Sequence, residues 1–167
     1  RDRDVTGVQT CALPILGIDI EALKPMGGKI EVKLSSPKGD IIKAHKDTTL
    51  SAGSNRIEFQ VQIEEPSLWW PNGIGPQNLY DLRISLVDEY GTEVSTGGKI
   101  GLREVKLKTK DDKGGECFVF EINGRPIFCK GANWIPADSF PARVTREKYE
   151  ELLQMAKDAN MNMIRIW

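Results

Sequence analysis

The chain has 167 residues and carries 23 Lys and Arg against 24 Asp and Glu, which gives a formal net charge of −1 at pH 7. A charge balance so close to zero argues against a protein that binds nucleic acid or a membrane surface through bulk positive charge. Because no apolar run approaches the roughly 18 residues that cross a bilayer, the sequence also excludes a transmembrane helix.

Residues 1–15 differ from the rest of the chain. They lack an initiator Met, and residues 5–15 resemble the conceptual translation of a common DNA-sequencing adapter. They show a period of neither 2 nor 3.6 residues, and a genuine short strand followed by a turn is the alternative interpretation. We expect a cloning or assembly scar, so that the native sequence begins within its gene and Cys11 has no role.

Residues 16–108 carry the pattern of antiparallel strands. Apolar residues alternate with polar ones in four stretches, namely Ile30, Val32 and Leu34; Ile57, Phe59, Val61 and Ile63; Leu82, Ile84 and Leu86; and Ile100, Leu102, Val105 and Leu107. Turn residues follow at 37–40 and 88–91, and a slip between Leu102 and Val105 predicts a β-bulge in the last strand. This regular alternation predicts an immunoglobulin-like β-sandwich of seven strands.

The metal-binding residue types are few. The single histidine, His45, has no nearby Cys or Ser partner, and we expect it at an exposed strand or loop position with no catalytic role. The three cysteines contain no Cys-x-x-Cys spacing, and Cys117 and Cys129 fall on opposite faces of a predicted hairpin, where they should stay unpaired. The sequence therefore implies neither a metal nor a cofactor.

Two adjacent tryptophans, Trp69 and Trp70, lie between Pro66 and Pro71. They could form a platform on which a carbohydrate ring stacks. They could equally form a buried plug that closes the end of the sandwich. We favour the plug, because tryptophan is mostly buried in folded proteins and the neighbouring residues are rigid turn formers.

The stretch from Phe118 to Cys129 predicts a β-hairpin with an Asn-Gly turn at 123–124. A two-residue turn fixes the facing pairs. Phe120 should therefore face Ile127, and Phe118 should face Cys129.

A helix and a further strand follow the hairpin. Residues 131–140 are expected to form a long loop, and Thr145 is the predicted N-cap of an amphipathic helix that Asn160 closes. Residues 161–167 then predict a mostly apolar strand. The order of strand, helix and strand predicts a βαβ unit with two parallel, buried strands.

One βαβ unit does not close a core. Residues 116–167 number only 52, whereas a (β/α)₈ barrel has about 250 residues. We therefore expect a mostly β chain, in which residues 109–167 are the truncated start of a barrel domain. Strands of a partial barrel should be poorly packed, because their edges are unpaired.

Several motifs carry a family resemblance. In chain order these are Leu68-Trp69-Trp70-Pro71-Asn72-Gly73, Gly101-Leu102-Arg103, Ile122-Asn123-Gly124-Arg125-Pro126, Lys130-Gly131-Ala132-Asn133-Trp134-Ile135-Pro136-Ala137-Asp138 and Asn162-Met163-Ile164-Arg165-Ile166-Trp167. Together they resemble glycoside hydrolase family 2. Ile166 and Trp167 stand where β-galactosidase relatives have His-Tyr-Pro, which favours the β-mannosidase branch.

The resemblance implies an N-terminal jelly roll, an immunoglobulin-like sandwich and then a catalytic barrel. The implied activity is a retaining, exo-acting β-mannosidase that removes terminal non-reducing β-D-mannosyl residues from oligosaccharides. Retention requires two carboxylates roughly 5–5.5 Å apart, and in the family both are glutamates on later barrel strands. No carboxylate of this chain is assigned to either role, and we expect Glu147, Glu150 and Glu151 to be solvated helix charges. The fragment alone should therefore be inactive.

The resemblance also suggests substrate-binding residues. Arg165 would orient the nucleophile carboxylate and Trp167 would wall the sugar pocket, with a structural ion pair and core packing as the alternatives. Asn133 and Asp138, on the first βα loop, could bind sugar hydroxyls, and Trp134 could stack on the ring. Loop capping or packing is the alternative for each of these three.

Two other functions stay open. The chain could belong to another family 2 glycosidase, of the β-galactosidase, β-glucuronidase or exo-glucosaminidase type. It could instead be a non-catalytic sandwich module that binds a sugar or a protein through the edge at Trp69 and Trp70.

Overall fold

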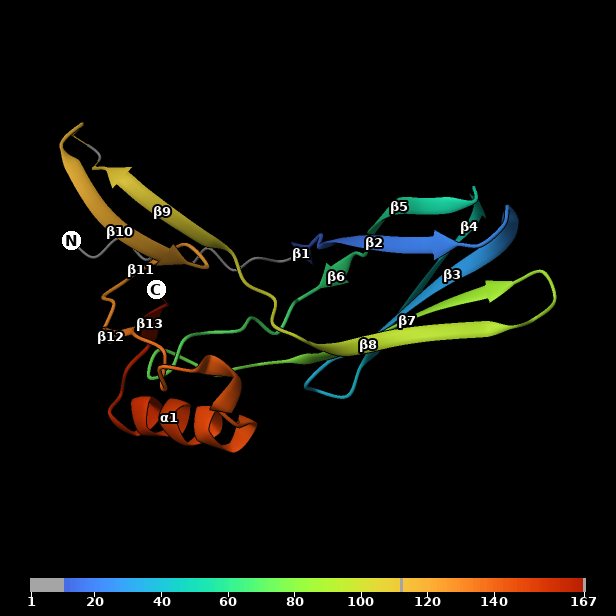
Figure 1. Cartoon of the computed structure of the whole chain (residues 1–167). Helices are drawn as coiled ribbons and strands as arrows, with labels where there is room; N and C mark the ends of the chain where they lie inside the picture. The colour runs from blue at the N-terminus through green and yellow to red at the C-terminus, as the bar shows by residue number, and fades with distance from the viewer. Residues whose placement is uncertain (1–10, 112, 167) are drawn as a thin grey trace. The chain divides into compact units, whose positions relative to one another are not determined.

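The computed structural model describes residues 11–111 and 113–166, which form two compact units (Figure 1). The first unit comprises residues 11–67 and 78–102, and the second comprises residues 68–77 and 103–166. The division at residue 102 falls six residues before the expected domain boundary. The segment 68–77, which contains both adjacent tryptophans, is grouped with the second unit.

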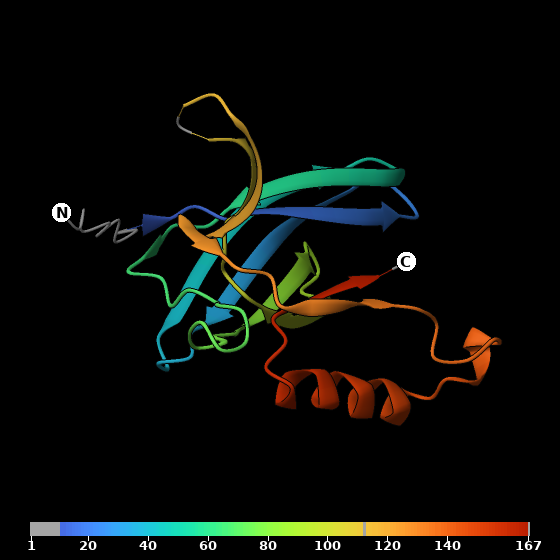
Figure 2. The same ribbon diagram turned by 90° about the vertical axis from the view of Figure 1, so that its left-hand side faces the viewer.

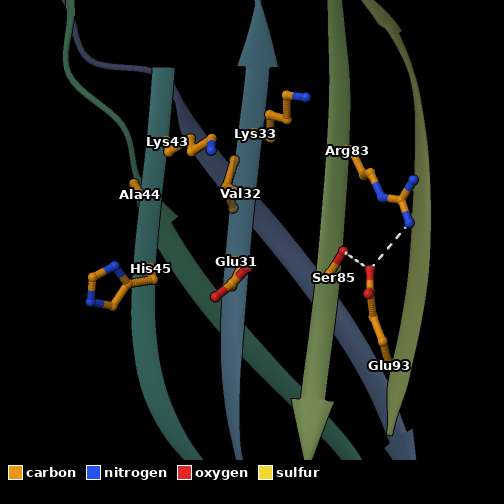
Figure 3. Close-up of a pocket in the computed structure, with 9 residues that line it drawn as sticks. All are labelled: Glu31, Val32, Lys33, Lys43, Ala44, His45, Arg83, Ser85 and Glu93. Atoms are coloured by element: carbon orange, nitrogen blue, oxygen red, sulfur yellow. Dashed lines mark hydrogen bonds and ion pairs between the residues drawn. The ribbon is translucent and has the colours of Figure 1, made fainter. Parts of the chain in front are cut away.

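The first unit consists of antiparallel sheets. Its four-stranded sheet has the order β4-β3-β7-β8 and contains β3 (Met26–Ser35), β4 (Ile41–Leu50), β7 (Tyr80–Asp88) and β8 (Glu93–Ile100). Two smaller pairs are formed by β2 (Ile15–Ala22) with β5 (Gly53–Gln60) and by β1 (Cys11–Ala12) with β6 (Ile63–Glu64). Figure 3 shows the β2–β5 pair crossing behind the four-stranded sheet, so the predicted sandwich is confirmed.

The core of the first unit lies between these sheets. Ile30, Val32 and Leu34 of β3 are almost completely buried, while the residues between them are exposed. Phe59 of β5 is also buried. Tyr80 is 1% exposed, and its hydroxyl accepts a hydrogen bond from the Ser67 backbone N–H at 2.8 Å, so its one polar atom is satisfied.

The predicted turns of the first unit are confirmed. Gly39 has a φ of 96° in the turn that links β3 to β4, and the Ser36 N–H donates to the Asp40 carbonyl. The Asp88 carboxylate accepts hydrogen bonds from the N–H groups of Tyr90 and Thr92, which closes the β7–β8 turn. His45 is exposed on β4, as expected.

The predicted bulged strand from Ile100 to Leu107 is wrong. β8 ends at Ile100, and β9 (Val105–Lys110) belongs to a different sheet. The ladder stops because Ile100 pairs with Tyr80, which is the first residue of β7 and leaves no partner beyond it. The slip in the apolar pattern therefore marks the passage from one unit to the next.

The hairpin of the second unit has the predicted turn. β10 (Glu116–Ile122) pairs with β11 (Arg125–Ile127) and with β9, and Phe120 faces Ile127 as expected. Asn123 and Gly124 have φ values of 52° and 75°, as a type I′ turn requires. β11 ends at Ile127, so the expected pairing of Phe118 with Cys129 is not formed. Cys117 and Cys129 are both free thiols.

The βαβ unit contains β12 (Gly131–Trp134), a short 3₁₀ helix (Pro141–Arg143), α1 (Arg146–Asp158) and β13 (Met163–Ile166). β12 and β13 are parallel, so a βαβ unit is formed, but its first strand is β12 and not the hairpin strand that was expected. The expectation of a loop over 131–140 is wrong for its first four residues, since they form β12. Figures 1 and 2 show α1 beside this pair of strands.

Both ends of α1 follow the predicted signals. The Thr145 hydroxyl accepts a hydrogen bond from the Lys148 N–H at 3.3 Å. Asn160 has a φ of 55°, and the N–H groups of Asn160 and Met161 donate to the Lys157 and Ala156 carbonyls, which is a Schellman motif. In the described part of the chain, no helix is long and apolar enough to cross a membrane.

The second unit exposes much apolar surface. No residue of α1 is buried, and the expected burial of β13 is not found, because Ile166 is 78% exposed. Phe118 and Phe128 are 72% and 82% exposed. Among the described residues the β12–β13 sheet has two strands, so each strand has one edge without a neighbouring strand.

Candidate functional site

The two parallel strands place Asn133 and Arg165 next to each other. These residues are register partners near the carboxyl ends of β12 and β13. The Arg165 guanidinium donates through Nη1 to Oδ1 of Asn133 at 3.3 Å, and both residues are exposed. The carboxyl ends of parallel strands are where active sites of (β/α)₈ enzymes form. We therefore take this pair as the centre of the candidate site.

Close backbone contact fixes the register that brings the pair together. A Cβ atom added at Gly131 would lie 1.9 Å from the Met163 carbonyl oxygen, so β12 approaches β13 as only glycine allows. The side chain of Asn162 bridges the starts of the strands, because it accepts from the Lys130 N–H at 2.8 Å and donates to the Phe128 carbonyl at 3.0 Å.

The helix between the strands is held by a residue that lies far away in the sequence. Nδ2 of Asn72 lies 3.1 Å from the carbonyl oxygens of both Lys157 and Met161, at the carboxyl end of α1. The Lys157 carbonyl also accepts from the Asn160 N–H, so Asn72 adds a second hydrogen bond at this helix end and ties the following Met161 to it. The sequence motifs contained Asn72 and Asn162, but the two positions gave no local signal of these roles.

Trp134 does not join Asn133 and Arg165. Successive side chains of a strand point to opposite faces, so Trp134 lies on the face opposite to Asn133. Its ring stacks on that of Tyr149 in α1, with 6.1 Å between ring centroids and an interplanar angle of 22°. This stacking is a packing contact, and the expected stacking of Trp134 on a sugar ring stays a prediction.

Asp138 also forms a local contact. Its Oδ1 accepts a hydrogen bond from the Phe140 N–H at 2.7 Å, which is the loop-capping geometry of an aspartate turn. Trp167, the fifth predicted substrate-binding residue, lies outside the described residues.

A groove of about 570 Å³ runs beside Arg165. Its walls come from the hairpin and from β13, and its lining is mostly apolar, with Phe118, Phe120, Ile122, Ile127, Met163 and Arg165 among the lining residues. A single cation in an apolar groove can orient an anionic group, but it supplies neither a nucleophile nor an acid.

Two carboxyl groups, those of Glu147 and Glu93, have shifted pKa values that do not favour a catalytic acid. The backbone N–H of Glu147 and the Thr145 hydroxyl hold the pKa of Glu147 below its usual value. Hydrogen bonds from Ser85 and Arg83 lower the pKa of Glu93. A catalytic general acid needs a raised pKa, so neither carboxyl has the required environment.

The other helix glutamates are solvated, as expected. Glu150 accepts from Arg146 at 2.7 Å and Glu151 accepts from Lys148 at 2.9 Å, and all four side chains are at least half exposed. Within residues 11–111 and 113–166, no group of three or more His, Cys, Asp or Glu side chains is placed to hold a metal ion.

The two adjacent tryptophans are half-buried and belong to the second unit, and their expected role in closing the end of the sandwich stays a prediction. The Arg103 guanidinium lies over the Trp69 ring, 4.5 Å from its centroid. Nδ2 of Asn123 donates to the Trp69 carbonyl at 3.0 Å. One face of the Trp69 ring is therefore covered by Arg103 and is not open to a sugar ring.

Known proteins with similar sequences include β-mannosidases. Beta-mannosidase B of Emericella nidulans is 41% identical over 119 residues, which is 71% of this chain and 14% of that protein. The beta-mannosidase of Rattus norvegicus is 37% identical over 154 residues, which is 89% of this chain and 17% of that protein. The chain thus spans less than a fifth of the length of these relatives.

Solved structures of glycosidases also match this chain. The crystal structure of the beta-D-mannosidase from Dictyoglomus thermophilum matches with a TM-score of 0.86 and 39% identity, over 97% of this chain and 20% of that one. A beta-glucuronidase from Bacteroides uniformis matches with a TM-score of 0.76 at 18% identity, over 95% of this chain and 19% of that one, which indicates a shared fold alone. The family profile described as glycosyl hydrolases family 2 matches residues 15–103, more than half of the sequence. The chain therefore belongs to glycosyl hydrolase family 2.

Proposed function

We propose that this chain is a segment of a retaining, exo-acting β-mannosidase that hydrolyses terminal non-reducing β-D-mannosyl residues. The observation that carries the proposal is the similarity to β-mannosidases at 37–41% identity over 71–89% of the chain. The structural match at 39% identity supports it, because that protein is also a β-mannosidase. The match to the β-glucuronidase has only 18% identity.

In the proposed mechanism, Arg165 is a positioning residue. Its guanidinium would donate charge-assisted hydrogen bonds to the nucleophile carboxylate and keep that group ionised and correctly oriented. Asn133 would hold the guanidinium through the 3.3 Å contact and present its amide to a sugar hydroxyl. The exposure of both side chains is compatible with such partners.

The two catalytic carboxylates would come from parts of the protein outside this chain. The first would attack the anomeric carbon and form a glycosyl–enzyme intermediate, while the second would protonate the leaving oxygen and then activate water. The lowered pKa values of Glu93 and Glu147 support this division, because a general acid is favoured by a raised pKa. We infer that the isolated chain is inactive.

A chimaeric enzyme tests the proposal. Residues 15–166 would replace the matching segment of the Dictyoglomus thermophilum β-D-mannosidase, and the 4-nitrophenyl β-D-mannoside, galactoside and glucuronide would be assayed. We expect the mannoside to be the preferred substrate and the isolated chain to show no turnover. Preference for another glycoside would refute the mannosidase assignment, and turnover by the isolated chain would refute the assignment of the carboxylates.

Variants of the chimaera test the role of Arg165. Lysine cannot reproduce the planar fork of arginine, so Arg165→Lys should lower kcat/KM by about 100-fold. Arg146→Lys is the matched control, since Arg146 is an exposed helix residue paired with Glu150. Equal activity of the two variants would show that Arg165 plays no part in positioning.

A further inference from the structure

The outer face of the four-stranded sheet contains a polar hollow of about 400 Å³ (Figure 3). Side chains from all four strands line it, including Lys33, Lys43, Arg83, Glu31, Ser85 and Glu93. The hollow lies wholly within the first unit. None of the residues proposed above to bind substrate contributes to it.

Three cations lie side by side across the hollow. Lys33 of β3 is the register partner of Lys43 on β4 and of Arg83 on β7. We call these three residues the cationic row. Like charges directly opposite one another destabilise an antiparallel pair. An anion between them would remove that repulsion.

The two carboxylates that line the hollow already have partners, and neither partner is Lys33 or Lys43. Glu93 accepts from the Ser85 hydroxyl at 2.6 Å and from Nη2 of Arg83 at 3.1 Å (Figure 3). Glu31 forms an ion pair with Lys29 at 2.7 Å. Ser85 is 7% exposed, so the Glu93 contact is anchored at the floor of the hollow.

Lys33 and Lys43 are therefore left without an acidic partner. Neither ammonium group forms an ion pair within the part of the chain that the structure describes, whereas Arg83 is tied to Glu93. Both lysines are exposed and line the same hollow. The uncompensated positive charge of the cationic row is thus concentrated at its β3–β4 end.

We propose that the cationic row binds a phosphate or sulfate group, carried on a sugar or free in solution, between the ammonium groups of Lys33 and Lys43. A compact oxyanion offers several acceptor oxygens to two ammonium groups, and such hydrogen bonds are charge-assisted. An extended acidic peptide fits less well, because it would also lie against the carboxylates of Glu31 and Glu93. The inference does not depend on the proposed glycosidase function.

The hollow is large enough to hold more than a bare phosphate or sulfate ion. Sites for small molecules have volumes of about 300–1,000 Å³, so the hollow can hold a sugar ring beside the anionic group. His45 lines the same hollow and offers a ring nitrogen for a sugar hydroxyl. We therefore expect a phosphorylated sugar to bind more tightly than inorganic phosphate.

Calorimetric titration of the full chain tests the proposal. The probes are inorganic phosphate, inorganic sulfate, glucose 6-phosphate and glucose, at constant ionic strength. The Lys33→Gln and Lys43→Gln double variant should weaken phosphate binding at least tenfold, and glucose should not bind. Lys46→Gln is the matched control, because Lys46 is on β4 but pairs with the buried Ile30 and so points to the other face.

The outcomes separate the sources of the anion. Tighter binding of glucose 6-phosphate than of phosphate supports a sugar-borne group, and equal binding supports a free oxyanion. Equal losses in the double variant and in Lys46→Gln would overturn the proposal, since bulk charge alone would then explain binding. Binding of a glutamate-rich peptide without binding of phosphate would also overturn it. Circular dichroism establishes that each variant is folded.

Discussion

Lys130 and Asn162 are joined by two hydrogen bonds that run in opposite directions. The Lys130 N–H donates to Oδ1 of Asn162, and the Asn162 N–H donates to the Lys130 carbonyl, both at 2.8 Å. The pair lies immediately before β12 and shortly before β13. It therefore sets the register in which Asn133 meets Arg165.

Substitutions of Asn162 should destabilise the second unit in graded steps. Asn162→Asp keeps the acceptor for the Lys130 N–H but loses the donor to the Phe128 carbonyl, and Asn162→Ala loses both. Each lost bond should cost about 1 kcal/mol. Hydrogen exchange of the β12 and β13 amides measures the effect. If both variants kept the protection of the unsubstituted chain, the Asn162 side chain would not hold the strands.

Gly131→Ala tests the close approach of the same strands. The added Cβ would meet the Met163 carbonyl oxygen, so β12 must move away from β13, at a cost of about 1–3 kcal/mol. Gly27→Ala is the control, because a Cβ at Gly27 in β3 meets nothing within 4 Å. We expect loss of exchange protection in β13 for the first variant and no loss for the second.

Local signals predicted the elements that are built from neighbouring residues. The Asn-Gly turn gave the correct register of Phe120 and Ile127, and Thr145 and Asn160 gave the two ends of α1. These features depend on backbone conformations that are set within a few residues. The strictly alternating strands of the sandwich were predicted for the same reason.

Features that depend on distant partners were not predicted. The segment 68–77 belongs to the second unit because Asn72 bonds to the end of α1 and Asn123 bonds to Trp69, across more than fifty positions. β12 was missed because its Gly-Ala-Asn-Trp sequence has no apolar alternation. Once β12 is known, alternation alone places Trp134 and Asn133 on opposite faces.

Asn72 should contribute to the stability of the second unit. Asn72→Ala removes the donor to the Lys157 and Met161 carbonyls, and we expect a loss of about 1–2 kcal/mol in the free energy of unfolding. Asn72→Asp should be worse, because a negative charge at the carboxyl end of a helix opposes the helix dipole. Gln77→Ala, in the same segment, is the control. Urea unfolding, followed by the helical signal in circular dichroism, measures the difference in the free energy of unfolding.

The pKa of Glu93 should depend on Ser85. In the folded chain the hydrogen bond from the Ser85 hydroxyl, helped by Arg83, lowers the pKa of Glu93 below its usual 4.5. A lowered carboxyl pKa contributes stability above about pH 4.5 and loses that contribution as the pH falls through the folded value. Ser85→Ala should therefore raise the pKa of Glu93 and reduce the acid sensitivity of the first unit.

Carboxyl-detected NMR titration measures this shift directly. Ser95→Ala is the matched control, since the Ser95 hydroxyl accepts from Nη2 of Arg83 but does not touch the carboxylate. We expect the Glu93 titration to move upwards in Ser85→Ala and to move less in Ser95→Ala. An unchanged titration in Ser85→Ala would mean that the 2.6 Å contact is not maintained in solution, and the floor of the polar hollow would then be open to solvent.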